Sequence, residues 1–151
     1  HVREGMTVLD FGCGPGFFTL DLARLVGPSG RVIAVDLQPG MLERVRLKTD
    51  GTELASRITL HQCQPNRVGI SGPLDFVFAF YVIHELPDAA AFLAELRPLF
   101  SPGGRLLIVE PPLHVSKAAF AATLQLAIQA GFRAVSRPNV GFNKAALLTP
   151  G

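Results

Sequence analysis

The chain has 151 residues, 48% of them apolar, which suits one domain with a single hydrophobic core. A net charge of +2 with scattered arginines argues against nucleic acid as the main partner. The sequence has no apolar run of 18 residues and no signal peptide, and its two cysteines are isolated. These features are typical of a cytoplasmic protein without a membrane span. Because the chain begins at His1 rather than Met, we expect one domain over 1–151 that lacks an N-terminal cap segment.

Short apolar runs alternate with helical periods along the first half of the chain. The first helix ends at Gly27-Pro28, and a second begins at Pro39, because proline is favourable in the first turn of a helix. Residues 64–73 have little helical pattern and are expected to be mainly loop. Three almost unbroken apolar runs predict strands that are buried on both faces, at residues 6–11, 31–36 and 57–63.

The second half continues this alternation and then changes. A helical stripe that runs as far as Phe100 follows Asp88, a suitable N-cap. Ser116 caps a fourth helix that ends at Gly131. The inward positions expected in that helix are Phe120, Leu124, Ala127 and Ile128. The remaining strands are predicted at residues 74–80, 105–110, 132–137 and 142–148, the last two joined as a hairpin.

This order of elements predicts an α/β fold. Strands that alternate with helices through right-handed crossovers give a doubly wound, mostly parallel sheet, here seven-stranded. The C-terminal hairpin makes the end of the sheet antiparallel. In such a sheet the ligand lies beyond the carboxyl ends of the strands, at the point where the strand order reverses.

The strongest motif lies where the first strand meets the first helix. There the sequence VLDFGCGPG places Gly12, Gly14 and Gly16 after Asp10. Glycines allow a tight turn and a close approach to a ligand, and the free N–H groups of the helix start favour an anion. A dinucleotide fingerprint would need a third glycine where Phe17 stands. A turn that binds nothing is the alternative.

An acid ends the second predicted strand. Asp36 follows the glycine motif by about twenty residues, where ribose-binding acids stand in nucleotide folds. The alternative is a charge that serves the N-terminus of the next helix. Leu37 and Met41 follow it and either cover an adenine face or pack in the core.

Four segments resemble the class I (Rossmann-like) S-adenosylmethionine-dependent methyltransferases, in the small-molecule branch similar to ubiquinone/menaquinone-biosynthesis enzymes. They read VLDFGCGPGFFT, VIAVDLQPGML, LDFVFAFYVIHELPD and LRPLFSPGGRLLIVEPP. The resemblance implies S-adenosylmethionine as cofactor and S-adenosylhomocysteine as product. It places the methionine part at the glycine loop, the ribose at Asp36 and the adenine after the third strand. The expected cofactor-binding residues are Asp10, Phe11, Gly12, Cys13, Gly14, Pro15, Gly16, Asp36, Leu37, Met41, Cys63, Gln64 and Phe80.

One position departs from the family pattern. Such enzymes often carry an aspartate after the third strand that binds the adenine amino group, whereas this chain has Cys63 and Gln64 there. The amide oxygen of a glutamine can accept the same hydrogen bond. A surface glutamine without a ligand is the alternative.

Candidate catalytic residues follow the fourth and fifth strands. Tyr81 presents an aromatic ring that can stabilise a sulfonium, and His84 can take a proton from an acceptor. His114 is a second candidate base. For His84 the alternative is a histidine at a helix start that is bonded to Glu85 or to the backbone, and for His114 it is a capping or solvated histidine. No His, Cys, Asp or Glu spacing predicts a metal site.

The sequence therefore predicts a methyltransferase that acts on a small-molecule acceptor, whose reacting atom stays open, as does oligomerisation. A non-catalytic cofactor-binding subunit on the same fold is one alternative. A NAD-dependent oxidoreductase is another, against which Phe17 and the closing hairpin argue.

Overall fold

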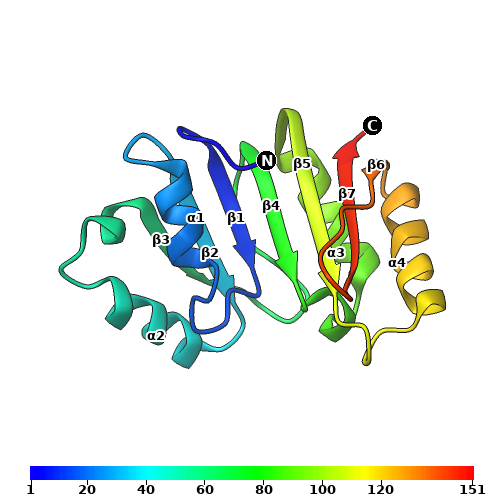
Figure 1. Cartoon of the computed structure of the whole chain (residues 1–151), viewed down its shortest axis with the longest axis horizontal. Coiled ribbons are helices and arrows are strands. Elements are labelled where there is room, and N and C mark those ends of the chain that lie inside the picture. Colours follow the sequence, from blue (N-terminus) through cyan, green and yellow to red (C-terminus); the bar gives the residue numbers. More distant parts are fainter.

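The computed structural model describes residues 1–151 and contains one seven-stranded sheet in the order β3-β2-β1-β4-β5-β7-β6 (Figure 1). Strands β1 to β5 pair in parallel, and β7 runs antiparallel between β5 and β6. The doubly wound, mostly parallel fold with an antiparallel C-terminal pair is confirmed. The strands are β1 (Thr7–Phe11), β2 (Arg31–Asp36), β3 (Ile58–Gln62), β4 (Leu74–Phe80), β5 (Phe100–Glu110), β6 (Phe132–Ser136) and β7 (Lys144–Pro150).

Four α-helices and three short 3₁₀ turns connect the strands. Two of the expected caps form: Asp88 accepts a hydrogen bond from the Ala91 N–H, and Ser116 accepts one from the Ala119 N–H. None of the helices is both long and apolar enough to cross a membrane. The helices are α1 (Thr19–Val26), α2 (Pro39–Thr49), α3 (Ala89–Leu96) and α4 (Lys117–Gln129), and the turns are η1 (Glu53–Arg57), η2 (Ile83–Glu85) and η3 (Arg97–Leu99).

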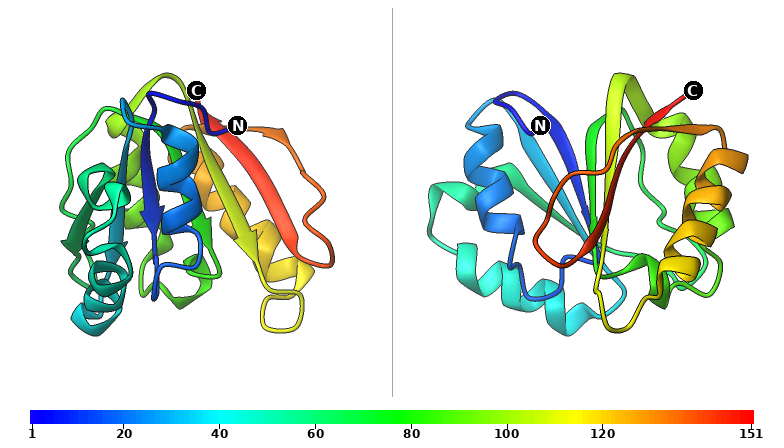
Figure 2. Two further views of the ribbon diagram at one scale, coloured as in Figure 1. Left: turned by 60° about the vertical axis from the view of Figure 1, so that its left-hand side comes forward. Right: turned by 45° about the vertical axis from the view of Figure 1, so that its right-hand side comes forward.

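The helices cover both faces of the sheet (Figure 2). Alternate strand residues such as Val8 and Val32 pack against α1, and their neighbours Leu9 and Ile33 belong to the larger core, which includes residues of α3 and α4. Successive side chains of a strand point to opposite faces of the sheet. A strand that is covered on both faces therefore needs apolar residues at nearly every position. This explains the unbroken apolar runs in the sequence.

The helical stripe expected to reach Phe100 is interrupted. Helix α3 ends at Leu96, and the 3₁₀ turn η3 replaces its last turn, because Pro98 has no N–H for the helical ladder. Strand β5 then begins at Phe100, five residues before the expected start at 105, with an irregular register against Leu74.

The carboxyl ends of β1, β2, β4 and β5 lie at one edge of the sheet. Strand β1 pairs with β2 on one side and with β4 on the other, because the chain runs from β1 through β2 to the edge strand β3 and then crosses back to β4. This is the reversal point at which doubly wound sheets bind their ligands.

Candidate functional site

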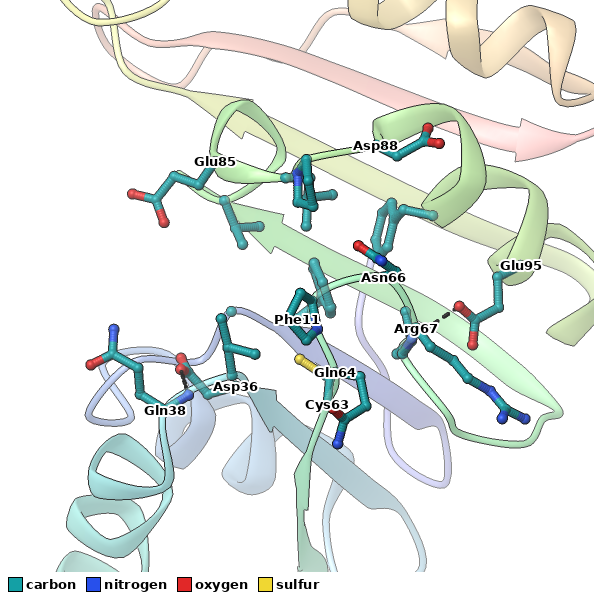
Figure 3. Close-up of a pocket in the computed structure, with 18 of the residues that line it drawn as sticks. Phe11, Asp36, Gln38, Cys63, Gln64, Asn66, Arg67, Glu85, Asp88 and Glu95 are labelled. Atoms are coloured by element: carbon teal, nitrogen blue, oxygen red, sulfur yellow. Dashed lines mark hydrogen bonds between the residues drawn. The ribbon is translucent and has the colours of Figure 1, made fainter.

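A cavity of about 370 Å³ opens at this reversal point (Figure 3). Its walls come from the ends of β1 and β2, the segment after β3, the turn after β4, and α3. The lining residues are Phe11, Gly12, Gly14, Asp36, Leu37, Gln38, Met41, Cys63, Gln64, Pro65, Asn66, Arg67, Val68, Tyr81, Val82, Glu85, Leu86, Pro87, Asp88, Phe92 and Glu95.

Two glycines of the glycine turn line this cavity, and each position requires glycine for a different reason. Gly12 has a φ of +71°, and a Cβ there would lie 2.5 Å from Cγ2 of Val82, so the turns after β1 and β4 touch at this point. Gly14 has a φ of +52°, and a Cβ there would meet no heavy atom within 4 Å. Gly14 therefore borders open space in the cavity rather than packed protein.

Asp36 ties this turn to the start of α2. Its Oδ2 accepts a hydrogen bond from the Gly14 N–H at 2.9 Å, and its Oδ1 accepts one from the Gln38 N–H at 2.9 Å. Gln38 is the N-cap of α2, so the carboxylate also serves the helix start that the sequence left as an alternative. Because each carboxylate oxygen has two lone pairs, both oxygens keep a free acceptor site at the cavity.

Four expected cofactor residues of the glycine motif lie behind the turn rather than in the cavity lining. Asp10 is 3% exposed and accepts a hydrogen bond from Oγ1 of Thr19 at 2.6 Å. Burial raises the pKa of Asp10 to about 6, although the Thr19 hydroxyl lowers it. Cys13 is buried, and this burial raises the pKa of its thiol. The Pro15 carbonyl accepts a hydrogen bond from Lys48, and Gly16 adjoins the side chains of α2 and α1.

The segment after β3 forms the opposite wall. Cys63 and Gln64 both line the cavity. Asn66, which the sequence analysis did not single out, points into the cavity in Figure 3. The segment is held by Glu95 of α3, whose carboxylate accepts hydrogen bonds from the Val68 and Gly69 N–H groups at 2.9 and 2.8 Å.

Tyr81 lines the cavity, is 38% exposed and has a strained backbone conformation. It is the one non-glycine residue with a positive φ, +59°, a region that ordinary side chains enter at a cost. Its N–H donates to the Val109 carbonyl, and its hydroxyl donates to Oδ1 of Asn143 at 2.5 Å. Phe80 lies outside the lining and stacks on Tyr81, with ring centroids 4.2 Å apart.

The two candidate histidines are in different positions. His84 lies on η2, between the lining residues Val82 and Glu85, and its Nδ1 is 2.5 Å from Oε2 of Glu110. Its partner is thus neither Glu85 nor a backbone group. His114 is exposed on the turn after β5, without a hydrogen bond to its ring and outside the cavity lining.

Glu110 is the main residue that sequence reasoning missed. It is 1% exposed and directly follows the four apolar residues 106–109 at the end of β5. Burial raises the pKa of its carboxyl group, while the bonds from His84 lower it. The signal that could have found it was a charge closing a buried strand at the ligand-binding edge. No group of three or more His, Cys, Asp or Glu side chains is arranged to hold a metal ion.

Comparisons with known proteins agree with this geometry. A family model described as a methyltransferase domain matches residues 2–136. The chain is 34% identical over 124 residues to the demethylmenaquinone methyltransferase of Lactococcus lactis, covering 77% of this chain and 47% of that protein. It is 31% identical over 123 residues to the Staphylococcus aureus enzyme of the same name, covering 80% and 50%. The chain thus spans about half the length of these curated relatives.

Among solved structures, an S-adenosylmethionine-dependent methyltransferase from Aquifex aeolicus is similar over 98% of this chain and 84% of that one. The TM-score is 0.86 and the sequence identity 28%. The fibrillarin of Aeropyrum pernix, solved with natively bound S-adenosylmethionine, shares the fold at a TM-score of 0.76 and 15% identity.

Proposed function

The chain belongs to the S-adenosylmethionine-dependent methyltransferases, and we propose that it transfers the methyl group of this cofactor to a small-molecule acceptor. The observation that carries the proposal is the cavity at the strand-order reversal, in which the glycine turn, Asp36 and Tyr81 face one space. Cavities of this size with a few converging polar groups are typical of small-molecule sites.

The residues present fit the cofactor that the family implies. The open space beside Gly14 leaves room for the methionine part, and a side chain at that position would fill it. The free acceptor sites of Asp36 suit two ribose hydroxyls. Cys63, Gln64 and Asn66 would border the adenine. When bound, the cofactor supplies a methyl group already activated on a sulfonium.

The acceptor would enter beside the turn after β4. A one-step displacement depends mainly on proximity and alignment, so the protein has to hold the reacting atom in line with the methyl group. Tyr81 is held in the cavity wall by its bonds to Val109 and Asn143, and His84 lies on η2 between the lining residues Val82 and Glu85. The names of the curated relatives make demethylmenaquinone one acceptor to test.

Calorimetry and methyl transfer together test this function. We expect S-adenosylmethionine and S-adenosylhomocysteine to bind with micromolar dissociation constants, about −8 kcal/mol, and NAD not to bind. Incubation with methyl-labelled S-adenosylmethionine and either demethylmenaquinone or a metabolite extract should give a labelled small molecule. Binding without transfer to any acceptor would favour a non-catalytic cofactor-binding subunit, and tight NAD binding alone would refute the proposal.

A further inference from the structure

Glu110 is a buried acid whose hydrogen bonds come from the turn η2, chiefly from His84. Its side chain is 1% exposed at the carboxyl end of β5. Oε1 accepts a hydrogen bond from the His84 main-chain N–H at 3.1 Å, and Oε2 lies 2.5 Å from Nδ1 of the same residue. Burial of a carboxylate costs free energy unless the group is hydrogen-bonded. The burial of Glu110 therefore depends on its hydrogen bonds with His84.

This two-point contact fixes how the imidazole ring stands. The main-chain contact sets the position of η2, and the Nδ1 contact sets the rotation of the ring. An ionised carboxylate only accepts hydrogen bonds, so Nδ1 has to carry the proton. In the neutral ring Nε2 is then the atom with the free lone pair.

Nε2 is also the atom that is left accessible. It makes no hydrogen bond within the protein, and the His84 side chain is 28% exposed. Because Nδ1 faces the buried acid, Nε2 lies on the part of the ring turned away from it. The ring itself is not part of the cavity lining, but Val82, the N-cap of η2, and Glu85 at its end both line the cavity, so His84 belongs to the segment that borders the proposed acceptor site.

We propose that Glu110 is a positioning residue that keeps Nε2 of His84 ready to take a proton, and that the acceptor is therefore an alcohol, phenol or amine carrying that proton on its reacting atom. This inference rests on the function proposed above. A bond forms between the acceptor oxygen or nitrogen and the methyl carbon while the bond from that carbon to the sulfonium sulfur breaks. The sulfur keeps the electron pair, and the acceptor proton passes to Nε2.

The same contact stabilises the product of that step. His84 becomes an imidazolium beside the Glu110 carboxylate, and a charge-assisted hydrogen bond between them is stronger than the neutral one it replaces. The proton then leaves to solvent from the exposed side of the ring. A protonated Glu110 would do the reverse: it would donate to Nδ1 and leave the hydrogen on Nε2, where no proton could be accepted.

The tautomer of His84 tests the positioning role without any acceptor. We would record long-range ¹H–¹⁵N spectra of the ¹⁵N-labelled full chain bound to S-adenosylhomocysteine, at a pH where the ring is neutral. His84→Gln identifies its signals among the four histidines. We expect the Nδ1–H tautomer, and an Nε2–H tautomer would overturn the inference.

A pair of acid-to-amide variants completes this test. Glu110→Gln should remove the preference of His84 for one tautomer. Glu53→Gln is the control and should keep that preference, because Glu53 lies on η1 before β3, the outermost strand on the other side of the sheet from β5. An unchanged tautomer in a folded Glu110→Gln would show that the acid does not position the ring. If Glu110→Gln does not fold, the tautomer of the native chain still decides.

The products test the acceptor class. Carbon-13-labelled methyl groups transferred to a metabolite extract should appear on oxygen or nitrogen, and products methylated only on carbon, sulfur or arsenic would overturn the inference. With the product known, Glu110→Gln should lower kcat by about 10-fold or more, with an unchanged dissociation constant for S-adenosylhomocysteine. Failure of S-adenosylhomocysteine to bind the native chain would instead refute the proposed function, whatever the tautomer.

Discussion

Gly14 allows cofactor binding to be separated from folding. A Cβ at this position would meet no protein atom within 4 Å, so Gly14→Ala creates no clash, and the N–H that donates to Asp36 is kept. Its φ of +52° is unfavourable for alanine, and we expect a loss of about 1–2 kcal/mol in the free energy of unfolding. For a chain of this length that corresponds to a fall in Tm of about 2–8 °C.

Binding should suffer more than stability, because the added methyl group projects into the space assigned to the methionine part. We expect the dissociation constant of S-adenosylhomocysteine to rise by about 10-fold or more, measured by calorimetry on the folded variant. Gly40→Ala is the matched control: its Cβ would also meet nothing within 4 Å, but it lies within α2 without a positive φ. It should bind normally and gain about 0.5–1 kcal/mol. Native affinity in Gly14→Ala would refute our placement of the cofactor.

Three further changes address other parts of the site. Asp36→Asn should raise the dissociation constant of S-adenosylhomocysteine by about 10- to 100-fold through weaker hydrogen bonds, and an unchanged value in calorimetry would limit Asp36 to holding Gly14. Burial raises the pKa of Asp10 from 3.8 to about 6, so the folded state holds this proton more tightly. The free energy of unfolding should therefore fall by about 2 kcal/mol between pH 4 and 6 relative to Asp10→Asn, and parallel urea-unfolding profiles would contradict this. Tyr81→Phe removes the bond to Asn143, and hydrogen exchange should become faster over residues 137–143 while S-adenosylhomocysteine affinity stays within about twofold; unchanged exchange would disprove the tether.

The strands could be predicted because burial on both faces leaves a purely local pattern. Helix boundaries and helix faces were less certain. Pro98 ends α3 early although the apolar spacing continues to Phe100. In α4, Phe120, Leu124 and Ala127 are buried as expected, but Ile128 is 49% exposed. The helical period marks a broad stripe of apolar residues, whereas the width of the buried face depends on what the helix packs against.

The half of the cavity made by distant segments could not be predicted in the same way. The glycine motif and Asp36 lie within one strand-helix-strand unit, so their spacing alone brings them together. Glu95 reaches the segment after β3 across 26 or 27 positions of sequence, and the Glu110–His84 pair spans 26. The local spacing of apolar residues gives no information about such contacts, because they depend on the order of strands in the sheet.

Three acids stabilise the loops at the carboxyl ends of the strands, where the proposed site lies. Asp10, Asp36 and Glu110 lie at or next to the carboxyl ends of β1, β2 and β5. Asp36 and Glu110 accept hydrogen bonds from the segments that follow the neighbouring strands β1 and β4, Asp36 also accepts one from the start of α2, and Asp10 accepts one from the start of α1. Two of them are almost fully buried, where an unpaired carboxylate would be strongly destabilising. Since their partners are Thr19, the Gly14 and Gln38 N–H groups, and His84, a loop that moved away would leave a buried charge or a bare acceptor. The same contacts that stabilise the loops therefore hold the proposed methionine, ribose and acceptor subsites in one arrangement.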